Sequence, residues 1–216
     1  MGKIDTIIFD FDGVIIDSMS IKESGFRHIF SAYDEIAVEK LVQFHHQQGG
    51  LNRREKIRYF FDVILANSAI SESVNVEHLL NSFSEYIMLK QRNMKYFNLD
   101  LISWIKARPK DLKLFIVSGA DEEEVIELTR FSGIYDSFKE ILGAPTAKDA
   151  NIQKLLNKYN LNPDRTIMIG DSINDFTGSF VNNIWFMGYN NRDLKKSCRY
   201  YLDSINDIDH LLEKIY

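Results

Sequence analysis

The sequence predicts an α/β fold: a Rossmann-like, doubly wound parallel sheet with a small all-helical domain inserted into it. Two observations support this prediction. Short apolar runs alternate with helical patterns over most of the chain, which is typical of a parallel sheet covered by helices on both faces. The stretch between the first and the second apolar run breaks this alternation, because it shows helical periodicity and no convincing strand.

The apolar runs have the length and the continuous apolar character of parallel strands that are buried on both faces. Four of them predict strands at Ile4–Phe9, Leu112–Val117, Thr166–Ile169 and Ile184–Met187, and a weaker fifth candidate is Phe138–Leu142. Apolar residues at helical spacing predict three later helices, marked by Val125, Leu128 and Phe131, by Ile152, Leu155, Leu156 and Tyr159, and by Ile205, Ile208, Leu212 and Ile215. Asp121, with Glu124 three residues later, is typical of a capping box that opens the first of these helices.

The stretch from about Asp17 to Met94 is expected to be helical throughout. Two of its segments follow helical spacing closely, one with Ile57, Phe60, Phe61, Ile64 and Leu65, the other with Val76, Leu79, Leu80, Phe83 and Ile87. About seventy-five residues is far more than one crossover between parallel strands needs. We therefore predict a Rossmann-like core formed by residues 1–16 and 95–216, and a helical cap domain formed by residues 17–94 that overhangs the end of the first strand.

The composition is that of an ordinary soluble globular protein. At 216 residues, with 26% charged and 45% hydrophobic side chains, the chain can bury one core plus a small inserted module. The net charge of −5 argues against nucleic acid as the main partner. The single cysteine, Cys198, excludes an internal disulfide and a Cys-based zinc site, and it fits a reducing cytosol. Because we find no signal peptide and no apolar run of membrane-spanning length, we expect a cytoplasmic protein without a membrane partner. The sequence leaves the oligomeric state open, monomer or dimer.

Two carboxylates follow the first predicted strand, in the run Asp10-Phe11-Asp12-Gly13. A charged carboxylate is costly to place at the end of a buried strand, because burial disfavours its ionised form. In an extended chain, residues two apart project to the same side, so Asp10 and Asp12 can converge on one point. Converging carboxylates repel each other unless a proton or a cation relieves them. The pair therefore predicts a Mg²⁺ site or an acid/base pair.

Polar residues also follow the other predicted strands, at the edge of the sheet where ligands of doubly wound folds bind. The second strand leads into Ser118-Gly119-Ala120, a hydroxyl and small residues before a helix, which suits an anion. The loop that begins at Gly143 delivers Lys148 at the start of another helix. The run Gly170-Asp171-Ser172-Ile173-Asn174-Asp175 supplies two further carboxylates after the third strong strand candidate.

This ordered set of acid, hydroxyl, cation and acid resembles the four motifs of the haloacid dehalogenase superfamily of phosphoryl-transfer enzymes. The motifs read Asp10-Phe11-Asp12-Gly13-Val14, Ser118, Lys148 and Gly170-Asp171 through Asp175. The helical insert matches the small helical cap of the branch that contains phosphoglycolate phosphatases and β-phosphoglucomutases. Singly, each motif also fits a turn, a helix cap or a surface lysine, but four motifs in the right order favour the family. An acid at the position of Asp12 points to a phosphate ester as the substrate. Dehalogenases of the family lack an acid at this position, and phosphonatases usually lack it too.

The resemblance implies a Mg²⁺-dependent phosphatase that acts on a small phosphorylated metabolite. Asp10 would be the nucleophile that forms an aspartyl-phosphate. Asp12 would protonate the leaving alcohol and then deprotonate the attacking water. Asp171, together with Asp10 and the backbone carbonyl of Asp12, would hold Mg²⁺, and Asp175 would support the metal shell or Lys148. The groups expected to neutralise the phosphoryl oxygens are Ser118, the amide of Gly119 and Lys148.

The predicted cap carries a basic run at the start of a helix capped by Asn52. Arg53 and Arg54 lie in the first turn of this helix, where the helix dipole disfavours cations. One interpretation is that one of them, preferably Arg53, binds a substrate anion. The alternative, a solvated basic face of the helix, is equally consistent with the pattern. The neighbouring His45-His46 pair is more typical of a satisfied polar pair than of a zinc site.

Two alternatives to the phosphatase stay open. The cap loop also resembles that of β-phosphoglucomutases, where an Arg at the place of Arg53 meets the distal phosphate, although those mutases typically have a His where this chain has Lys22. A sugar-phosphate mutase is therefore the first alternative. A catalytically silent binding protein on the same fold is the second, and the loss of Asp10, Lys148 or Asp171 would have indicated it; all three are present.

Overall fold

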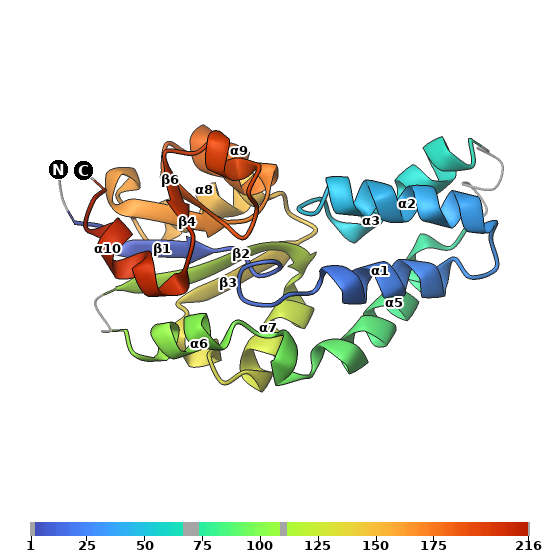
Figure 1. Cartoon of the computed structure of the whole chain (residues 1–216), viewed down its shortest axis with the longest axis horizontal. Coiled ribbons are helices and arrows are strands. Elements are labelled where there is room, and N and C mark those ends of the chain that lie inside the picture. The colour runs from blue at the N-terminus through green and yellow to red at the C-terminus, as the bar shows by residue number, and fades with distance from the viewer. Residues whose placement is uncertain (1–2, 67–73, 109–111, 216) are drawn as a thin grey trace. The chain divides into compact units, whose positions relative to one another are not determined.

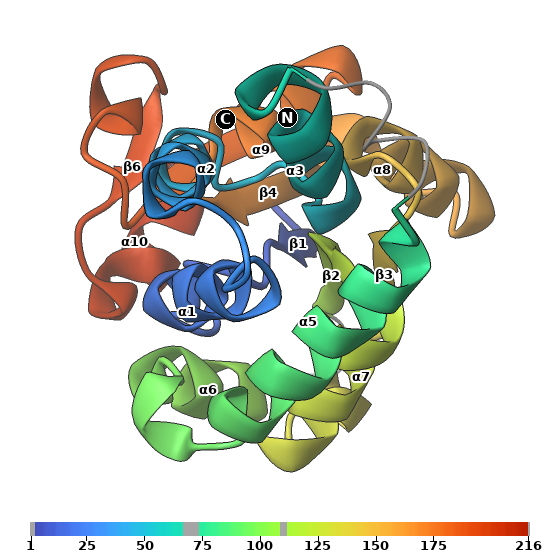
Figure 2. The ribbon, with the colours of Figure 1, turned by 90° about the vertical axis from the view of Figure 1, so that its right-hand side faces the viewer.

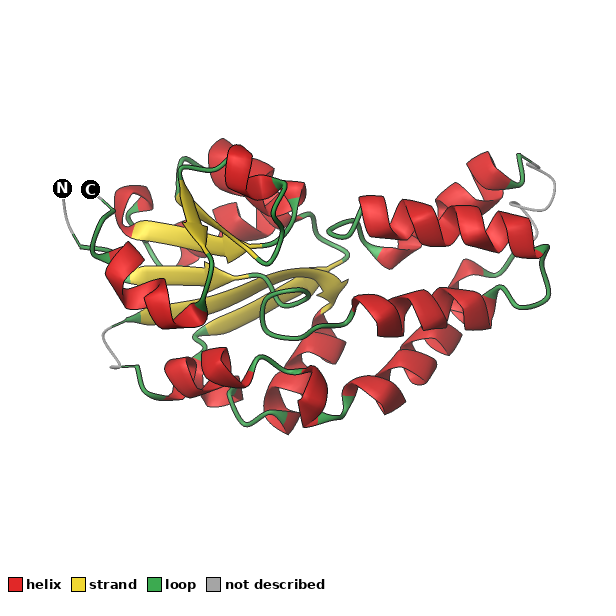
Figure 3. Ribbon diagram, viewed as in Figure 1, coloured by secondary structure: helices red, strands yellow, loops and turns green. Residues whose placement is uncertain are grey.

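The computed structural model describes residues 3–66, 74–108 and 112–215. The chain divides into two compact units, Met1–Asp17 with Met94–Tyr216, here called the sheet unit, and Ser18–Asn93, here called the helical unit. Among the described residues, the strands, drawn in yellow in Figure 3, all belong to the sheet unit. None of the helices described is long and apolar enough to cross a membrane.

The sheet unit is built on one sheet of six parallel strands in the order β3-β2-β1-β4-β5-β6. The strands are β1 (Thr6–Phe9), β2 (Lys113–Asp121), β3 (Glu140–Ala144), β4 (Thr166–Gly170), β5 (Trp185–Tyr189) and β6 (Tyr200–Leu202). The chain runs outward from β1 to β3, returns to β4 beside β1, and then runs outward to β6 on the other side. This reversal places the topological switch point between β1 and β4, where ligands of doubly wound sheets bind.

The helices of the sheet unit cover both faces of the sheet, with α8 and α9 on one face and α6 and α7 on the other (Figure 1). They are α6 (Leu99–Lys106), α7 (Glu122–Phe131), α8 (Lys148–Lys158), α9 (Ile173–Val181) and α10 (Ile208–Leu212), with 3₁₀ turns at Met94–Tyr96, Tyr135–Ser137, Pro163–Arg165, Leu194–Lys196 and Ile205–Asp207. Asp121 is the N-cap of α7 and accepts a hydrogen bond from the amide of Glu123 at 3.1 Å. The predicted α/β fold with a doubly wound parallel sheet is confirmed.

The observed strands differ from the predicted ones in two places. β2 was expected to end at Val117 but continues to Asp121, and its pairing with β3 shifts register between these two residues. β6 was not predicted, because it has only three residues and only Leu202 is buried. The other strands begin and end within two residues of their predicted limits.

The described part of the helical unit consists of α1 (Met19–Ile29), α2 (Glu35–Gln47), α3 (Arg53–Tyr59), a π-helical turn (Phe60–Ile64) and α5 (Val76–Gln91). Both segments with predicted helical spacing are helical, although a π-helical turn continues α3. α1 and α5 lie side by side (Figure 1 and Figure 2). At Gly25 the two helices approach closely, since a Cβ atom there would lie 2.8 Å from side-chain carbons of both Phe83 and Ile87.

The burial of β1 explains how the sheet positions a polar site. All four residues of β1 are buried, because neighbouring strands flank it and helices cover both faces of the sheet. The strand therefore reads as a continuous apolar run. The residue that follows, Asp10, stays in this buried environment, and its amide still donates to the carbonyl of Ile169 at 2.9 Å. The sheet thus places a carboxylate at the switch point.

Candidate active site

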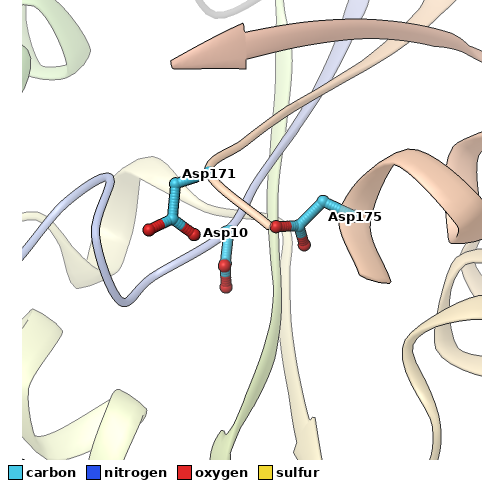
Figure 4. Close-up of side chains that lie close together, drawn as sticks. All are labelled: Asp10, Asp171 and Asp175. Carbon is cyan, nitrogen blue, oxygen red and sulfur yellow. The ribbon is translucent and has the colours of Figure 1, made fainter. Parts of the chain in front are cut away.

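Three carboxylates converge at the carboxyl ends of β1 and β4. Asp10 follows β1, Asp171 follows β4, and Asp175 lies in the first turn of α9. Each offers an oxygen, and these oxygens lie within 4.8 Å of one another (Figure 4). The side chains of Asp10 and Asp175 are almost completely buried. The structure therefore brings together Asp10, Asp171 and Asp175, the three acids whose side chains the sequence placed at or beside the predicted Mg²⁺ site.

Lys148 connects two of these acids. It is the first residue of α8, and its Nζ atom lies 2.8 Å from Oδ2 of Asp10 and 2.5 Å from Oδ1 of Asp175. Its side chain is only 7% exposed. Burial alone would lower the pKa of Lys148, but the two carboxylates raise it above its usual value, so the lysine is charged at neutral pH.

The contacts of Asp175 explain how this lysine is held. Asp175 and Ser172 form a reciprocal capping box at the start of α9, in which the amide and the hydroxyl of Ser172 donate to Oδ2 of Asp175 at 3.0 and 2.6 Å. The other carboxylate oxygen accepts from Lys148. Gly170 permits this approach, because a Cβ atom there would lie 2.4 Å from the Cβ of Asp175. Both oxygens of Asp175 therefore have protein partners, which favours support of Lys148 over direct metal binding.

The electrostatics of the cluster favour a bound cation. Burial raises the pKa of Asp10 well above its usual value, and Asp175 raises it further, while Lys148 acts in the opposite direction. Burial, and then Asp175, raise the pKa of Asp171 to about 7. Like charges in a buried site cannot all ionise without compensation. A divalent cation would supply that compensation, and a set of carboxylate oxygens suits Mg²⁺.

Asp12 lies close enough to this cluster to raise the pKa of both Asp10 and Asp171. Its side chain is partly exposed, whereas that of Asp10 is buried. The chain turns sharply after it, since the amide of Gly13 donates to the carbonyl of Ile16 at 2.8 Å. Gly13 has a φ of +76°, and a Cβ atom there would lie 1.9 Å from Oδ2 of Asp171, so this position requires glycine. Asp12 is thus beside the acids that could hold a metal ion, and it is accessible to solvent.

Ser118 and Gly119 lie within β2 rather than in a loop after it. Phe9 of β1 is in register with Ile116 of β2, so Ser118 lies two residues further along, at the edge of the sheet where Asp10 follows β1. The buried hydroxyl of Ser118 accepts a hydrogen bond from the amide of Ala120 at 3.0 Å. This contact occupies an acceptor site and leaves the hydroxyl proton for a ligand oxygen.

The predicted basic residues of the cap lie at the start of α3, and Asn52 caps this helix by accepting from the amide of Glu55 at 3.0 Å. Nη1 of Arg53 donates to the hydroxyl of Ser84 at 2.6 Å, and Nη1 of Arg54 pairs with Glu77 at 2.6 Å. These contacts explain how two cations are held in the first turn of a helix, against the helix dipole. The role of Arg53 in binding substrate stays a prediction.

His45 and His46 have different surroundings. His46 is exposed and contacts Glu23 at 3.1 Å. His45 is buried, and its Nδ1 atom lies 2.9 Å from Nζ of Lys56, which also donates to the carbonyl of Gly49. Burial, and then the positive charges of Lys56 and Lys22, lower the pKa of His45 to about 2. Among the described residues, no acidic side chain lies close enough to both histidines to complete a zinc site.

The depressed pKa of His45 predicts that the protein loses stability in mild acid. The unfolded chain binds a proton at this residue below a pH of about 6.5, and the folded chain does not, so each pH unit below that value should cost up to about 1.4 kcal/mol. His45→Asn keeps an acceptor for Lys56 but cannot titrate, so its free energy of unfolding should fall less between pH 7 and pH 5. Urea unfolding followed by far-UV circular dichroism measures this. His46→Asn is the matched control, and equal slopes for wild type and His45→Asn would contradict the prediction.

Several residues that hold the site were not predicted from the sequence. Nδ2 of Asn151 donates to the carbonyls of Gly143 and Thr146 at 3.1 and 3.3 Å, which fixes the loop before Lys148. The carboxylate of Glu122 accepts from the amide of Gly143 at 3.1 Å. These contacts join side chains to backbone groups of loops, so no spacing in the sequence indicates them. The Ser172 capping box could have been found, because Ser followed three residues later by an acid is a known helix-start pattern.

Comparisons with known proteins agree with this geometry. The chain matches the haloacid dehalogenase-like hydrolase family over residues 7–189. It is 27% identical over 176 residues to a phosphoglycolate phosphatase of Psychrobacter arcticus, a match that covers 78% of this chain and 76% of the relative.

Among solved structures, the chain resembles β-phosphoglucomutase from Clostridium difficile, with a TM-score of 0.73, 19% identity and 98% of each chain covered. It also resembles the hydrolase YfnB from Bacillus subtilis, solved bound to magnesium, with a TM-score of 0.70, 17% identity, and 98% of this chain and 100% of that chain covered. At these identities, the two structures show a common fold. The resemblance seen in the sequence and the predicted class of enzyme, a phosphatase, are confirmed by the family match and the phosphatase relative. The chain belongs to the haloacid dehalogenase-like hydrolase family.

Proposed function

We propose that this protein is a Mg²⁺-dependent phosphatase that hydrolyses a small phosphomonoester through an aspartyl-phosphate on Asp10. The observation that carries the proposal is the buried contact of Lys148 with Asp10 and Asp175, beside Asp171. A structural ion pair needs one acid for one lysine. The additional acids raise the pKa values of Asp10 and Asp171, which costs stability and is typical of functional sites.

In this proposal, Asp10 attacks the phosphorus atom, and Lys148 favours the ionised, reactive form of the Asp10 carboxylate. An ionised carboxylate is the nucleophile, and the ammonium 2.8 Å from Oδ2 favours ionisation against the effect of burial. The amide of Phe11 donates to Oδ1 of Asp10 at 2.7 Å, which fixes the orientation of the carboxylate. The attack forms a bond from an Asp10 oxygen to phosphorus and breaks the bond from phosphorus to the alcohol oxygen.

Asp12 then serves as the acid and base. Its partly exposed side chain, next to Asp10 and Asp171, can give a proton to the leaving alcohol and afterwards take one from the water that hydrolyses the aspartyl-phosphate. The hydroxyl of Ser118 and the amide of Gly119 donate to the phosphoryl oxygens, and Lys148 offsets their charge. Asp10, Asp171 and the backbone carbonyl of Asp12 would hold Mg²⁺, which supplies positive charge to the phosphoryl group and offsets its repulsion from the acids.

The helical unit, Ser18–Asn93, is proposed to be the cap that selects the substrate. Arg53 would bind a second anionic group, as a bidentate partner of a carboxylate or phosphate. The phosphoglycolate phosphatase relative supports a compact anionic ester such as phosphoglycolate, or a sugar phosphate of similar size. The scarcity of cysteine supports a cytoplasmic location.

Release of inorganic phosphate from a panel of esters tests the proposal. The panel contains phosphoglycolate, several sugar phosphates and p-nitrophenyl phosphate, each with Mg²⁺, with EDTA, and with EDTA followed by excess Mg²⁺. We expect turnover with Mg²⁺, its loss in EDTA and its recovery on adding Mg²⁺. Absence of release from every ester by the folded protein would overturn the proposal. Interconversion of sugar phosphates without release would favour the mutase alternative.

A further inference from the structure

Tyr189, the last residue of β5, and the two residues after it make hydrogen bonds that lead to the loops of the candidate active site. The OH of Tyr189 accepts from Nδ2 of Asn98 at 2.9 Å, Nδ2 of Asn190 donates to the carbonyl of Gly13 at 2.9 Å, and Nδ2 of Asn191 donates to the carbonyl of Asp171 at 2.8 Å. Asn98 in turn donates from its backbone amide to the carbonyl of Ile15 at 2.9 Å. The segment 189–191 therefore connects the loop after β1 with the loop after β4.

These two loops carry the acids that are proposed to bind Mg²⁺. The pairing of β1 with β4 ends at Phe9 and Ile169, just before the acids begin. Beyond the sheet, the backbone of Gly13 lies directly against the carboxylate of Asp171. A small shift of either loop would therefore change the distance between the carboxylates of Asp10 and Asp171.

The conformation of the segment 189–191 allows it to contact the loops after β1 and β4 at the same time. Asn190 has a φ of +55°, in the left-handed region that Asn tolerates better than most residues. The turn directs the amide of Asn190 to one loop and the amide of Asn191 to the other. Oδ1 of Asn191 also accepts from the amide of Asp193 at 3.1 Å, so both ends of its side-chain amide are engaged. This fixes which atom of Asn191 faces Asp171.

We propose that Asn190 and Asn191 are positioning residues that set the distance between the Asp10 and Asp171 loops and so the affinity of the site for Mg²⁺. This inference rests on the proposed function. Neither side chain is expected to touch Mg²⁺ or substrate, because each contacts the backbone carbonyl of the loop that it holds. Residues that orient metal ligands in this way typically change metal affinity about 10- to 100-fold when they are replaced.

The test compares Mg²⁺ binding by the full chain and by three variants. Asn191→Ala removes the contact with Asp171, Asn190→Gly removes the contact with Gly13 and keeps the left-handed turn, and the third variant combines both. Isothermal titration calorimetry with Mg²⁺ alone gives the Kd without substrate. The half-saturating Mg²⁺ concentration and kcat for hydrolysis of the best ester give a second readout.

We expect the double variant to bind Mg²⁺ about 10-fold or more weakly and the single variants to lie between it and wild type. At saturating Mg²⁺, kcat of the variants should recover most of its wild-type value. Asn162→Ala is the control, because its side chain accepts a hydrogen bond of 2.9 Å from the amide of Asp164 at the opposite end of β4. Its Kd for Mg²⁺ should equal that of wild type.

A double variant that binds Mg²⁺ as tightly as wild type would overturn this inference alone, and the proposed function would stand. A wild-type protein that neither binds Mg²⁺ nor releases phosphate would overturn both. If the double variant does not fold, the Kd of the single variant Asn190→Gly for Mg²⁺ tests the inference instead. This variant is expected to fold, since Asn190 is exposed and glycine adopts its φ without strain. An unchanged Kd in that variant would equally contradict the inference.

Discussion

Replacing Asp10 by Asn should reduce phosphate release by at least about 10³-fold while the protein stays folded. The amide is not a nucleophile toward phosphorus, but it has nearly the same shape as the carboxylate. Its oxygen can still accept from the amide of Phe11, which contacts Asp10 at 2.7 Å. Removing one of several buried like charges should not destabilise the protein strongly. Initial rates of phosphate release and far-UV circular dichroism check both parts of the prediction.

Asp5→Asn is the matched control, because Asp5 lies just before the other end of β1, where it pairs with Arg165 at 2.8 Å. It is the same chemical change close to the same strand, and it should leave the rate within a few-fold of wild type. A second readout follows the intermediate: acid quenching during turnover should trap phosphate on wild type and none on Asp10→Asn. An Asp10→Asn enzyme with full activity would show that another group attacks phosphorus.

The sequence predicted the central strands well because burial on both faces leaves a simple signal. β1 and β4 lie in the middle of the sheet, and every residue of both is buried, so each reads as a continuous apolar run. The edge strand β6 gives no such signal. The extension of β2 through Ser118 to Asp121 also could not be read, because it depends on pairing with Ala144 of β3, a contact between distant parts of the chain.

The candidate site was predicted as a set of residues but not as a set of contacts. Asp10, Lys148 and Asp171 were found because each follows a strand, and parallel strands end at one edge of the sheet. The sequence left open whether Asp175 supports the metal or Lys148. That choice depends on the packing of α8 beside α9, which brings Lys148 within 2.5 Å of Asp175. Packing between helices sets this distance, and spacing along the chain does not encode it.

Replacing Lys148 by Met should affect stability and activity together. The ammonium is the shared partner of Asp10 and Asp175, at 2.8 and 2.5 Å, and methionine of similar length leaves both carboxylates buried without it. Breaking a buried pair on one side typically costs about 3–5 kcal/mol, so the free energy of unfolding without Mg²⁺ should fall by about that amount. Because a positive charge beside the phosphoryl group is also lost, kcat should fall about 10²- to 10³-fold. Urea unfolding and initial rates measure the two effects.

Lys158→Met is the control that shows whether the loss of any lysine in α8 would change stability and kcat. Lys158 lies at the other end of the same helix and pairs with Glu140 at 2.8 Å, but its side chain is 51% exposed, so its removal should change neither stability nor rate measurably. Saturating Mg²⁺ should restore part of the stability of Lys148→Met, since a cation among the acids relieves their repulsion. It should not restore kcat, because Mg²⁺ cannot replace the hydrogen bonds of the ammonium. Full recovery of kcat would mean that Mg²⁺ can replace the ammonium and that the hydrogen bonds of Lys148 are not needed for turnover.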